Sequence, residues 1–102
     1  MAYSEILDAL GDPTRRRIFE ALRAGPLSVT DLTTTQTVSR PAVSQHLRVL
    51  EEAGLVAATA KGTRRLYGIQ RGAVEELRGY LDTFWADVIA AYSTEVQRRF
   101  GN

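Results

Sequence analysis

Apolar residues in the middle of the chain recur at the spacing of an α-helix. Val43, Leu47 and Leu50 are four and three positions apart, so they form one apolar stripe. On the opposite side, the basic residues Arg40 and Arg48 come first along the segment. Both of its acidic residues, Glu51 and Glu52, lie at its C-terminal end. Acidic side chains at a helix C-terminus oppose the helix dipole, so helix stability alone does not explain this order. A helix that enters the DNA major groove by its N-terminal end does explain it, and we predict a recognition helix over residues 40–53.

Two helices are predicted at the start of the chain. Residues 3–10 carry apolar side chains at helical spacing, and Gly11 ends this helix. Asp12 followed by proline is typical of an N-cap and a first helical position, so a second helix is expected from there to about residue 24. Arg15 lies beside the inward-facing side of this second helix. We favour a carboxylate or carbonyl partner for the Arg15 side chain over a contact with DNA. The inward-facing residues are expected to be Ile18, Phe19 and Leu22.

The third helix is predicted to be short. Ser28 and Asp31 have the spacing of a capping box, and the threonines at 33–35 are poor helix formers, so the helix should end near residue 35 or 36. A brief turn then leads to the recognition helix, whose cap is either Ser39 or Arg40. Two short helices joined by a turn of three or four residues are the signature of a helix-turn-helix.

After the recognition helix the pattern changes from helical to extended. Segments 55–60 and 63–69 flank Lys61–Gly62, and glycine in a two-residue link supplies the positive φ that a hairpin turn needs. We therefore predict a β-hairpin with a basic tip. Two strands are not stable alone, so the hairpin should lie against the helices. Successive strand residues face opposite ways, so Arg64 and Arg65 are not both expected at one surface, and one of them can be an ordinary solvent-facing charge.

From residue 71 to about residue 100 the pattern is helical again. Apolar residues step by one, three or four positions along this segment, which predicts one long amphipathic helix. Its stripe includes Phe84, Trp85 and Tyr92, which is more apolar surface than the core of a 102-residue monomer covers easily. The helix either packs only on its own domain or pairs with the same helix of a second copy. Its length and aromatic content favour pairing.

Composition and charge narrow the class of protein. A chain of 102 residues is expected to form one domain, residues 1–102. The net charge is +1, but residues 40–71 carry +4 and residues 73–102 carry −2, so one end can face phosphate while the other faces protein or solvent. The sequence has no Cys, acids near its N-terminus that argue against a signal peptide, and no apolar run long enough to span a bilayer. A cytoplasmic protein without a membrane partner is therefore expected.

Four sequence blocks together resemble the ArsR family of bacterial transcriptional repressors: Leu10–Ile18, Ser39–Leu50, Glu52–Val56 and Gly62–Tyr67. The resemblance covers roughly residues 5–92. It implies a mainly α winged helix-turn-helix with a small β-hairpin, in the order α-α-α-α-β-β-α. It also implies a homodimer held by the first and last helices. Such a dimer binds a palindromic operator in double-stranded DNA, with the recognition helix in the major groove and the hairpin as the wing.

The metal sites of that family are not matched here. Metal-sensing members place cysteines in the helix before the recognition helix, where this chain has Ser28 and Thr30, both poor ligands for soft metals. Others use His and carboxylates on the last helix, which has no His in this sequence. His46, at the edge of the apolar stripe, is expected to be packed or hydrogen-bonded. Three acidic residues of the last helix could gather a hard cation across a dimer, but they are expected on its solvated side: Asp82, Asp87 and Glu95. The chain therefore resembles the metal-independent branch, with no cofactor and no metal.

Specific residues are expected to contact DNA and the second copy. Gln45 is the best candidate for reading a base edge, because a carboxamide pairs two ways with adenine. Arg40 and Arg48 can contact guanine or phosphate, and their helix positions do not decide between these. The expected DNA contacts are Ser39, Arg40, Pro41, Ser44, Gln45, Arg48, Lys61, Arg64 and Arg65. The expected dimer interface is Ile6, Leu10, Leu81, Phe84, Trp85, Val88 and Tyr92.

Two further functions stay open from the sequence. A ligand-responsive repressor would hold a small-molecule effector of unknown identity in a dimer pocket lined by Phe84, Trp85 and Tyr92. A winged helix that serves only protein contacts would not need the +4 charge of residues 40–71. An enzyme is disfavoured, because the sequence has no Cys, one His, no Gly-rich phosphate loop and no Gly-x-Ser-x-Gly elbow.

Overall fold

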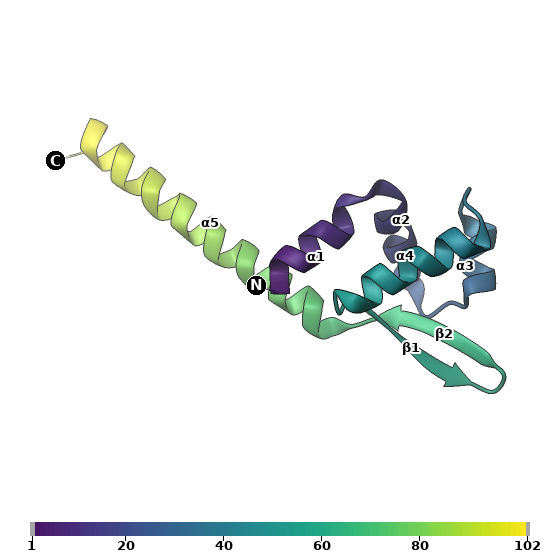
Figure 1. Ribbon diagram of the computed structural model, residues 1–102. Coiled ribbons are helices and arrows are strands. Elements are labelled where there is room, and N and C mark those ends of the chain that lie inside the picture. Colours follow the sequence, from purple (N-terminus) through teal and green to yellow (C-terminus); the bar gives the residue numbers. More distant parts are fainter. Residues whose placement is uncertain (1, 102) are drawn as a thin grey trace.

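The fold is mainly helical and elongated. The computed structural model describes residues 2–101 and measures 68 × 25 × 24 Å. Along the chain the elements are α1 (Ala2–Gly11), α2 (Pro13–Ala21), the 3₁₀ turn η1 (Leu22–Ala24), α3 (Val29–Thr35), α4 (Arg40–Glu52), β1 (Val56–Lys61), β2 (Arg64–Ile69) and α5 (Arg71–Phe100). The first four helices and the hairpin form a body from which α5 projects (Figure 1). The predicted architecture, a winged helix-turn-helix with a two-stranded antiparallel sheet, is confirmed.

Side-chain caps begin three of the helices. Asp12 caps α2 and accepts a hydrogen bond of 2.8 Å from the amide three residues further on. Ser28 and Asp31 form the expected capping box of α3, with hydrogen bonds of 3.1 and 3.3 Å. Ser39 caps α4, which settles the choice between Ser39 and Arg40 that the sequence left open. Each cap satisfies a backbone amide that the first turn of a helix leaves without a partner.

Helix α2 ends earlier than the sequence predicted. The regular α-helix stops at Ala21, and the next three residues form the 3₁₀ turn η1. The amide of Gly25 donates a hydrogen bond of 3.1 Å to the Leu22 carbonyl, which closes this tighter turn. Pro26 follows and cannot continue a helix, so the last carbonyls find their partners in the 3₁₀ pattern.

Arg15 joins the end of α1 to the start of α2. Its Nε donates a hydrogen bond of 2.6 Å to the Ala9 carbonyl, and its guanidinium also donates to the Asp8 carbonyl at 3.3 Å. These carbonyls belong to the last turn of α1, where no further helical amide follows to satisfy them. The predicted carbonyl partner of Arg15 is confirmed.

Gly54 ends α4 with a Schellman motif. The Gly54 amide donates to the Glu51 carbonyl at 3.0 Å, and the Leu55 amide donates to the Leu50 carbonyl at 2.9 Å. Gly54 has a φ of +78°, the left-handed conformation that this motif requires and that glycine adopts without a steric penalty. Leu50 and Leu55 are both buried in the core, so the reversal of the chain also fixes the root of the hairpin.

The hairpin has a turn one residue further on than predicted. Its strands pair from Val56↔Ile69 to Lys61↔Arg64, so the two-residue turn is Gly62–Thr63 and not Lys61–Gly62. Gly62 has a φ of +64° at the first turn position. A type II′ hairpin turn needs a positive φ at that position, and this requirement sets the register of the strands.

A short backbone bridge attaches the hairpin to the body. The amide of Leu27 donates to the Tyr67 carbonyl at 3.0 Å, and the amide of Tyr67 donates to the Leu27 carbonyl at 2.8 Å. The root of the hairpin is held as well, because the Gln70 amide donates to the Leu55 carbonyl at 2.8 Å. The expectation that the hairpin lies against the helical part of the molecule is therefore confirmed.

The hydrophobic core joins α1–α4 to the root of the hairpin. Its largest fully buried side chains are Ile6, Ile18, Leu32, Val43, Leu47, Leu50, Leu55 and Val56. Leu22 is also buried, and Phe19 packs against the core with part of its surface exposed. Helix α5 contributes Ala73 to the core, and Leu77 packs against it. The body is thus assembled around the apolar face of α4.

The expectation that Ile6 lies at a dimer interface is wrong. Its side chain is 1% exposed within the core of its own protomer, so it has no surface to offer to a partner. Ile6 and Ala9 are three positions apart on α1 and face inward together. The neighbouring Leu7 is 44% exposed, whereas Leu10 packs partly against the core.

Helix α5 extends well beyond the body. Its 30 residues correspond to a length of about 45 Å. The radius of gyration is 18.6 Å, whereas a compact domain of about 100 residues has a value near 13 Å. Among residues 2–101, neither α5 nor any other helix combines the length and the apolarity needed to cross a membrane.

Candidate nucleic-acid interface

Helix α4 presents two opposite faces with different chemistry. Val43, Leu47 and Leu50 are completely covered by the core. His46 is half-buried at the edge of this stripe. The opposite face is exposed and carries the residues expected to contact DNA: Arg40, Pro41, Ser44, Gln45 and Arg48. The buried face fixes the helix to the body, so the exposed face is held in one orientation.

The two arginines of the hairpin have different partners. Arg64 donates hydrogen bonds to the Asp31 carboxylate at 2.8 Å and to the Ser28 hydroxyl at 3.1 Å. The guanidinium of Arg65 lies 5.7 Å from the centre of the Tyr67 ring, two residues along the same strand. Both side chains nevertheless line one basic cleft, of about 440 Å³, between α3, the start of α4 and the hairpin turn. The charge of Arg64 is therefore paired within the protein, whereas that of Arg65 faces a neutral ring.

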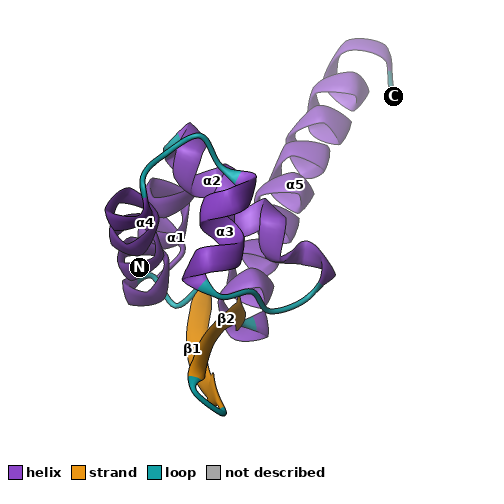
Figure 2. Ribbon diagram, turned by 90° about the vertical axis from the view of Figure 1, so that its right-hand side faces the viewer, coloured by secondary structure: helices purple, strands orange, loops and turns teal. Residues whose placement is uncertain are grey.

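The start of α4 is linked to α3. The Arg40 guanidinium donates a hydrogen bond of 2.9 Å to the Thr30 hydroxyl, close to the residues that bind Arg64. Figure 2 shows α3 above the hairpin, with α4 beside it. In Figure 1 this region lies at the end of the molecule opposite the C-terminus. The basic ends of α4 and of the hairpin are thus brought to one side of the body.

Two carboxyl groups, Asp31 beside the hairpin and Asp12 at the start of α2, have a pKa below its usual range. Hydrogen bonds from the Ser28 side chain and amide lower the pKa of Asp31 from its ordinary value of 3.8, and Arg64 lowers it further. The amide of Arg15 is the largest cause of a lowered pKa at Asp12, the cap of α2. Both carboxylates are therefore more stable as anions in the folded protein than in the unfolded chain.

The free energy of unfolding is expected to fall as the solution is acidified below about pH 4. A carboxyl group with a lowered folded pKa contributes stability that is fully present above the unfolded value, 3.8, and is lost as the pH falls through the folded value. Urea unfolding measured from neutral to acidic pH checks this. The double variant D12N/D31N, whose asparagine side chains can still accept the amide hydrogen bonds at the starts of α2 and α3, should lose less stability on acidification. An unchanged slope would contradict the assignment.

One face of α5 exposes a long apolar surface. Trp85 is 60% exposed and Tyr92 is 69% exposed, values unusual for such large apolar side chains. Other residues that the sequence placed on this stripe are also exposed: Leu81, Phe84, Ile89 and Val96. Val88, expected at the same interface, is half-buried. A continuous exposed face with this many large apolar side chains is typical of a protein–protein interface.

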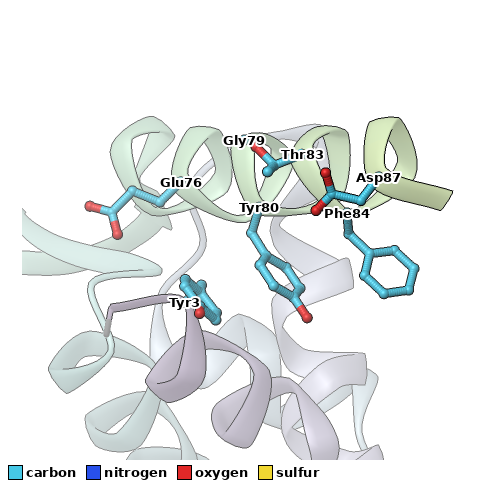
Figure 3. A pocket seen from close by; sticks show the side chains of 7 residues that line it. All are labelled: Tyr3, Glu76, Gly79, Tyr80, Thr83, Phe84 and Asp87. Atoms are coloured by element: carbon cyan, nitrogen blue, oxygen red, sulfur yellow. The ribbon is translucent and has the colours of Figure 1, made fainter. Parts of the chain in front are cut away.

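A separate pocket lies where the start of α1 meets α5. It has a volume of about 620 Å³ and is lined by Tyr3, Glu76, Tyr80, Phe84 and Asp87, among others. The Tyr3 and Tyr80 rings are stacked with their centres 4.3 Å apart, and Phe84 follows along α5 (Figure 3). The sequence placed Phe84 beside a pocket but missed both tyrosines, because their approach depends on how α1 packs on α5. Trp85 and Tyr92 do not line this pocket.

Within residues 2–101, no three His, Asp or Glu side chains gather in a way that could hold a metal ion. The two positions that the family resemblance equates with cysteine ligands are used differently. Ser28 caps α3 and accepts a hydrogen bond from Arg64, and the Thr30 hydroxyl accepts one from Arg40. Both hydroxyls thus hold structural elements together.

The amphipathic α4, the helix that precedes it and the attached hairpin define a winged helix-turn-helix DNA-binding protein. The sequence profile of the family described as bacterial regulatory protein, arsR family, matches residues 12–58. The HTH-type transcriptional regulator Rv2034 of Mycobacterium tuberculosis is 48% identical over 85 residues, covering 83% of this chain and 79% of the relative. The chain belongs to the ArsR family. It is a transcriptional regulator and not an enzyme.

Solved structures support the same assignment. An ArsR-like transcriptional regulator from Rhodococcus sp. RHA1 superposes with a TM-score of 0.85 at 26% identity, covering 94% of this chain and 91% of that one. A homodimeric winged helix-turn-helix DNA-binding domain from Mycobacterium bovis superposes with a TM-score of 0.67 at 26% identity, covering 84% and 79% of the two chains. The fold therefore matches along nearly the whole of α1–α5.

Proposed function

We propose that the protein is a homodimeric repressor that binds a palindromic operator in the cytoplasm and regulates its own promoter. The observation that carries this proposal is the two-faced α4, whose buried stripe fixes the helix and whose exposed face carries Ser44, Gln45 and Arg48. Such a helix fits the major groove of DNA, and the hairpin then reaches the adjacent DNA backbone. A dimer bound across a promoter represses by excluding the polymerase from the same DNA.

The dimer is supported by the exposed apolar face of α5. Trp85 and Tyr92 would be buried against the same helix of a second copy, which removes the largest exposed apolar side chains from water. The M. bovis relative described above is homodimeric. Two recognition helices related by a two-fold axis would meet half-sites about 34–36 Å apart, one turn of DNA.

The protein is proposed to act without a metal or another cofactor. Ser28 and Thr30 stand where the sequence resemblance places cysteine ligands, and both hydroxyls already accept hydrogen bonds from arginines. Hydroxyl oxygens are poor ligands for the soft metals that thiolates select. Operator binding is therefore expected to be unaffected by soft metal ions or by a chelator.

Replacing Gln45 by alanine is expected to weaken operator binding by about 1–3 kcal/mol and to relax specificity at one base pair in each half-site. The carboxamide can pair with an adenine edge through two hydrogen bonds, and its position on the exposed face of α4 allows this contact. Fluorescence anisotropy with the operator and with single-base variants of it measures both effects.

The control is Gln70→Ala, which removes an exposed carboxamide at the start of α5. Gln70 lies at the end of the hairpin opposite its tip. It should leave the affinity and the base preference unchanged. Equal losses on operator and random DNA for Gln45→Ala would show that Gln45 does not read a base.

Selection of bound fragments from the host genome tests the proposed function directly. Recovery of the region upstream of the protein's own gene, with an inverted repeat spaced by one helical turn, is the expected outcome. If wild-type protein retains no duplex fragment at low ionic strength, the repressor proposal fails. Retention of other proteins instead of DNA would favour a winged helix that serves protein contacts.

A ligand-responsive repressor is the second candidate, and the pocket between α1 and α5 is the observation that favours it. A volume of about 620 Å³ lies in the range that small-molecule sites occupy. A ligand there would contact both helices expected to form the dimer. A small molecule that binds the wild type and loses affinity on Tyr80→Ala, while lowering operator affinity, would establish this function.

A further inference from the structure

The pocket between α1 and α5 combines aromatic rings with carboxylates. Tyr3, Tyr80 and Phe84 supply the rings, and Glu76 and Asp87 supply two negative charges. No lysine, arginine or histidine belongs to the lining, so the lining has a formal charge of −2. Aromatic ring faces and carboxylates both attract cations, so this lining favours a cationic ligand and repels an anionic one.

Neither carboxylate of the pocket is compensated within residues 2–101. The acids in the ion pairs of α5 are Glu75 and Glu95, and none of these pairs involves Glu76 or Asp87. Arg78 is the base nearest to both along α5, but it lies about 160° around the helix axis from Glu76. Helix α1, which forms the other wall, carries two acids and no base. The charges of the pocket are therefore available to a ligand.

The two carboxylates stand at opposite ends of the aromatic part of the pocket. Glu76 and Asp87 are separated by about 16.5 Å along α5, which is close to three full turns, so both project from the same side of the helix. Figure 3 shows the rings of Tyr3 and Tyr80 between them. These rings are stacked, and the Phe84 ring follows with its centre 6.4 Å from that of Tyr80. The pocket thus has an aromatic floor with one anionic group towards each end.

We propose that this pocket binds a linear polyamine, an aliphatic chain with ammonium groups at both ends and between them. The two terminal ammonium groups pair with Glu76 and Asp87. The chain lies along the rings, which cover its methylene groups and attract an inner ammonium group through their π-electrons. A compact cation would reach only one carboxylate, so the spacing selects a long ligand. The proposal deepens the second candidate function, because it names the ligand class of the same pocket.

The position of the pocket links its occupancy to the proposed dimer. Phe84 lines the pocket and is also 54% exposed on the apolar face of α5 that would meet the second copy. Tyr3 brings α1 into the same pocket. A polyamine bound there contacts both helices beside the interface that would set the spacing of the two recognition helices.

Isothermal titration calorimetry of the wild-type protein with spermine tests the proposal. The titration is made without DNA, because polycations also bind DNA phosphates. One spermine should bind per protomer. Glu76→Gln and Asp87→Asn should each weaken binding by about tenfold, the loss expected for one charge-assisted hydrogen bond. Tyr80→Leu keeps an apolar side chain but removes a ring, and should weaken binding by about two- to fivefold.

One variant and one modified ligand serve as controls. Asp82→Asn removes the same charge from an exposed residue of α5, about 140° around the helix axis from Asp87, and should bind spermine as the wild type does. Spermine acetylated at both ends has lost its terminal charges and should bind the wild type about a hundredfold more weakly than spermine. Glu76 and Asp87 are exposed, and thermal unfolding should show that both variants are folded.

The outcomes separate this proposal from the proposed function. If Glu76→Gln and Asp87→Asn bind spermine as tightly as the wild type, the pocket is not the site. If tetramethylammonium binds as tightly as spermine, a compact cation is the ligand and the polyamine assignment is overturned. Operator affinity of the wild type, measured without spermine, tests the repressor separately. A protein that binds its operator but no spermine would refute the polyamine site and leave the repressor intact.

Discussion

Trp85→Glu is expected to convert the proposed dimer into monomers and to lower operator affinity by a factor of about 10²–10⁴. Trp85 is 60% exposed on α5, so a carboxylate there leaves the core of the protomer intact. In the dimer the same carboxylate would be buried without a partner, which is strongly unfavourable. A monomer has one recognition helix and loses the gain in affinity that comes from binding two half-sites at once. Sedimentation equilibrium and a DNA mobility shift measure the two effects.

Ala90→Glu is the matched control for this substitution. Ala90 is also exposed on α5 but lies about 140° around the helix axis from Trp85. It introduces the same charge on the same helix, outside the apolar stripe. The control should remain dimeric and bind the operator with unchanged affinity. A dimeric Trp85→Glu protein with full affinity would show that this face of α5 is not the interface.

Leu47→Ala is expected to lower the free energy of unfolding by about 2–5 kcal/mol, the cost of deleting a large buried side chain and leaving a cavity. Leu47 is 1% exposed on the inner face of α4, between Val43 and Leu50. Domains of this size are stable by roughly 5–15 kcal/mol, so the substitution removes a large part of the total. Urea unfolding at a fixed protein concentration measures the change, since the proposed dimer would make stability depend on concentration.

The volume-conserving variant Leu47→Met provides the comparison. It should cost less than about 1.5 kcal/mol, because methionine fills nearly the same space in the core. Operator affinity measured on the folded fraction should be nearly unchanged in Leu47→Met. If Leu47→Ala were as stable as Leu47→Met, the apolar stripe of α4 would not be the centre of the core.

Several features of the fold were predictable because their causes are local. The caps at Asp12, Ser28 and Ser39 involve a side chain and an amide three residues away, so they can be read from neighbouring positions. The end of α4 at Gly54 depends on the freedom of glycine at positive φ. The inner face of α4 follows from helical periodicity alone.

Other features were missed because they depend on distant parts of the chain. The bond between Arg64 and Asp31 spans 33 positions, and nothing in the hairpin sequence distinguishes Arg64 from Arg65 as the one that makes it. Whether Ile6 or Leu7 faces the core depends on how α1 is rotated against the body. The hairpin turn was placed one residue too early, because both alternatives put a glycine in a two-residue link.

The sequence by itself determined the order of the elements, the inner stripe of α4 and the excess of positive charge over residues 40–71. Tertiary structure alone decided which arginine is paired, which α1 side chain is buried and where the basic cleft and the α5 pocket lie. The reason is physical. Caps, turns and helical stripes arise from interactions within a few residues, whereas ion pairs, burial and cavities arise where elements far apart in sequence meet.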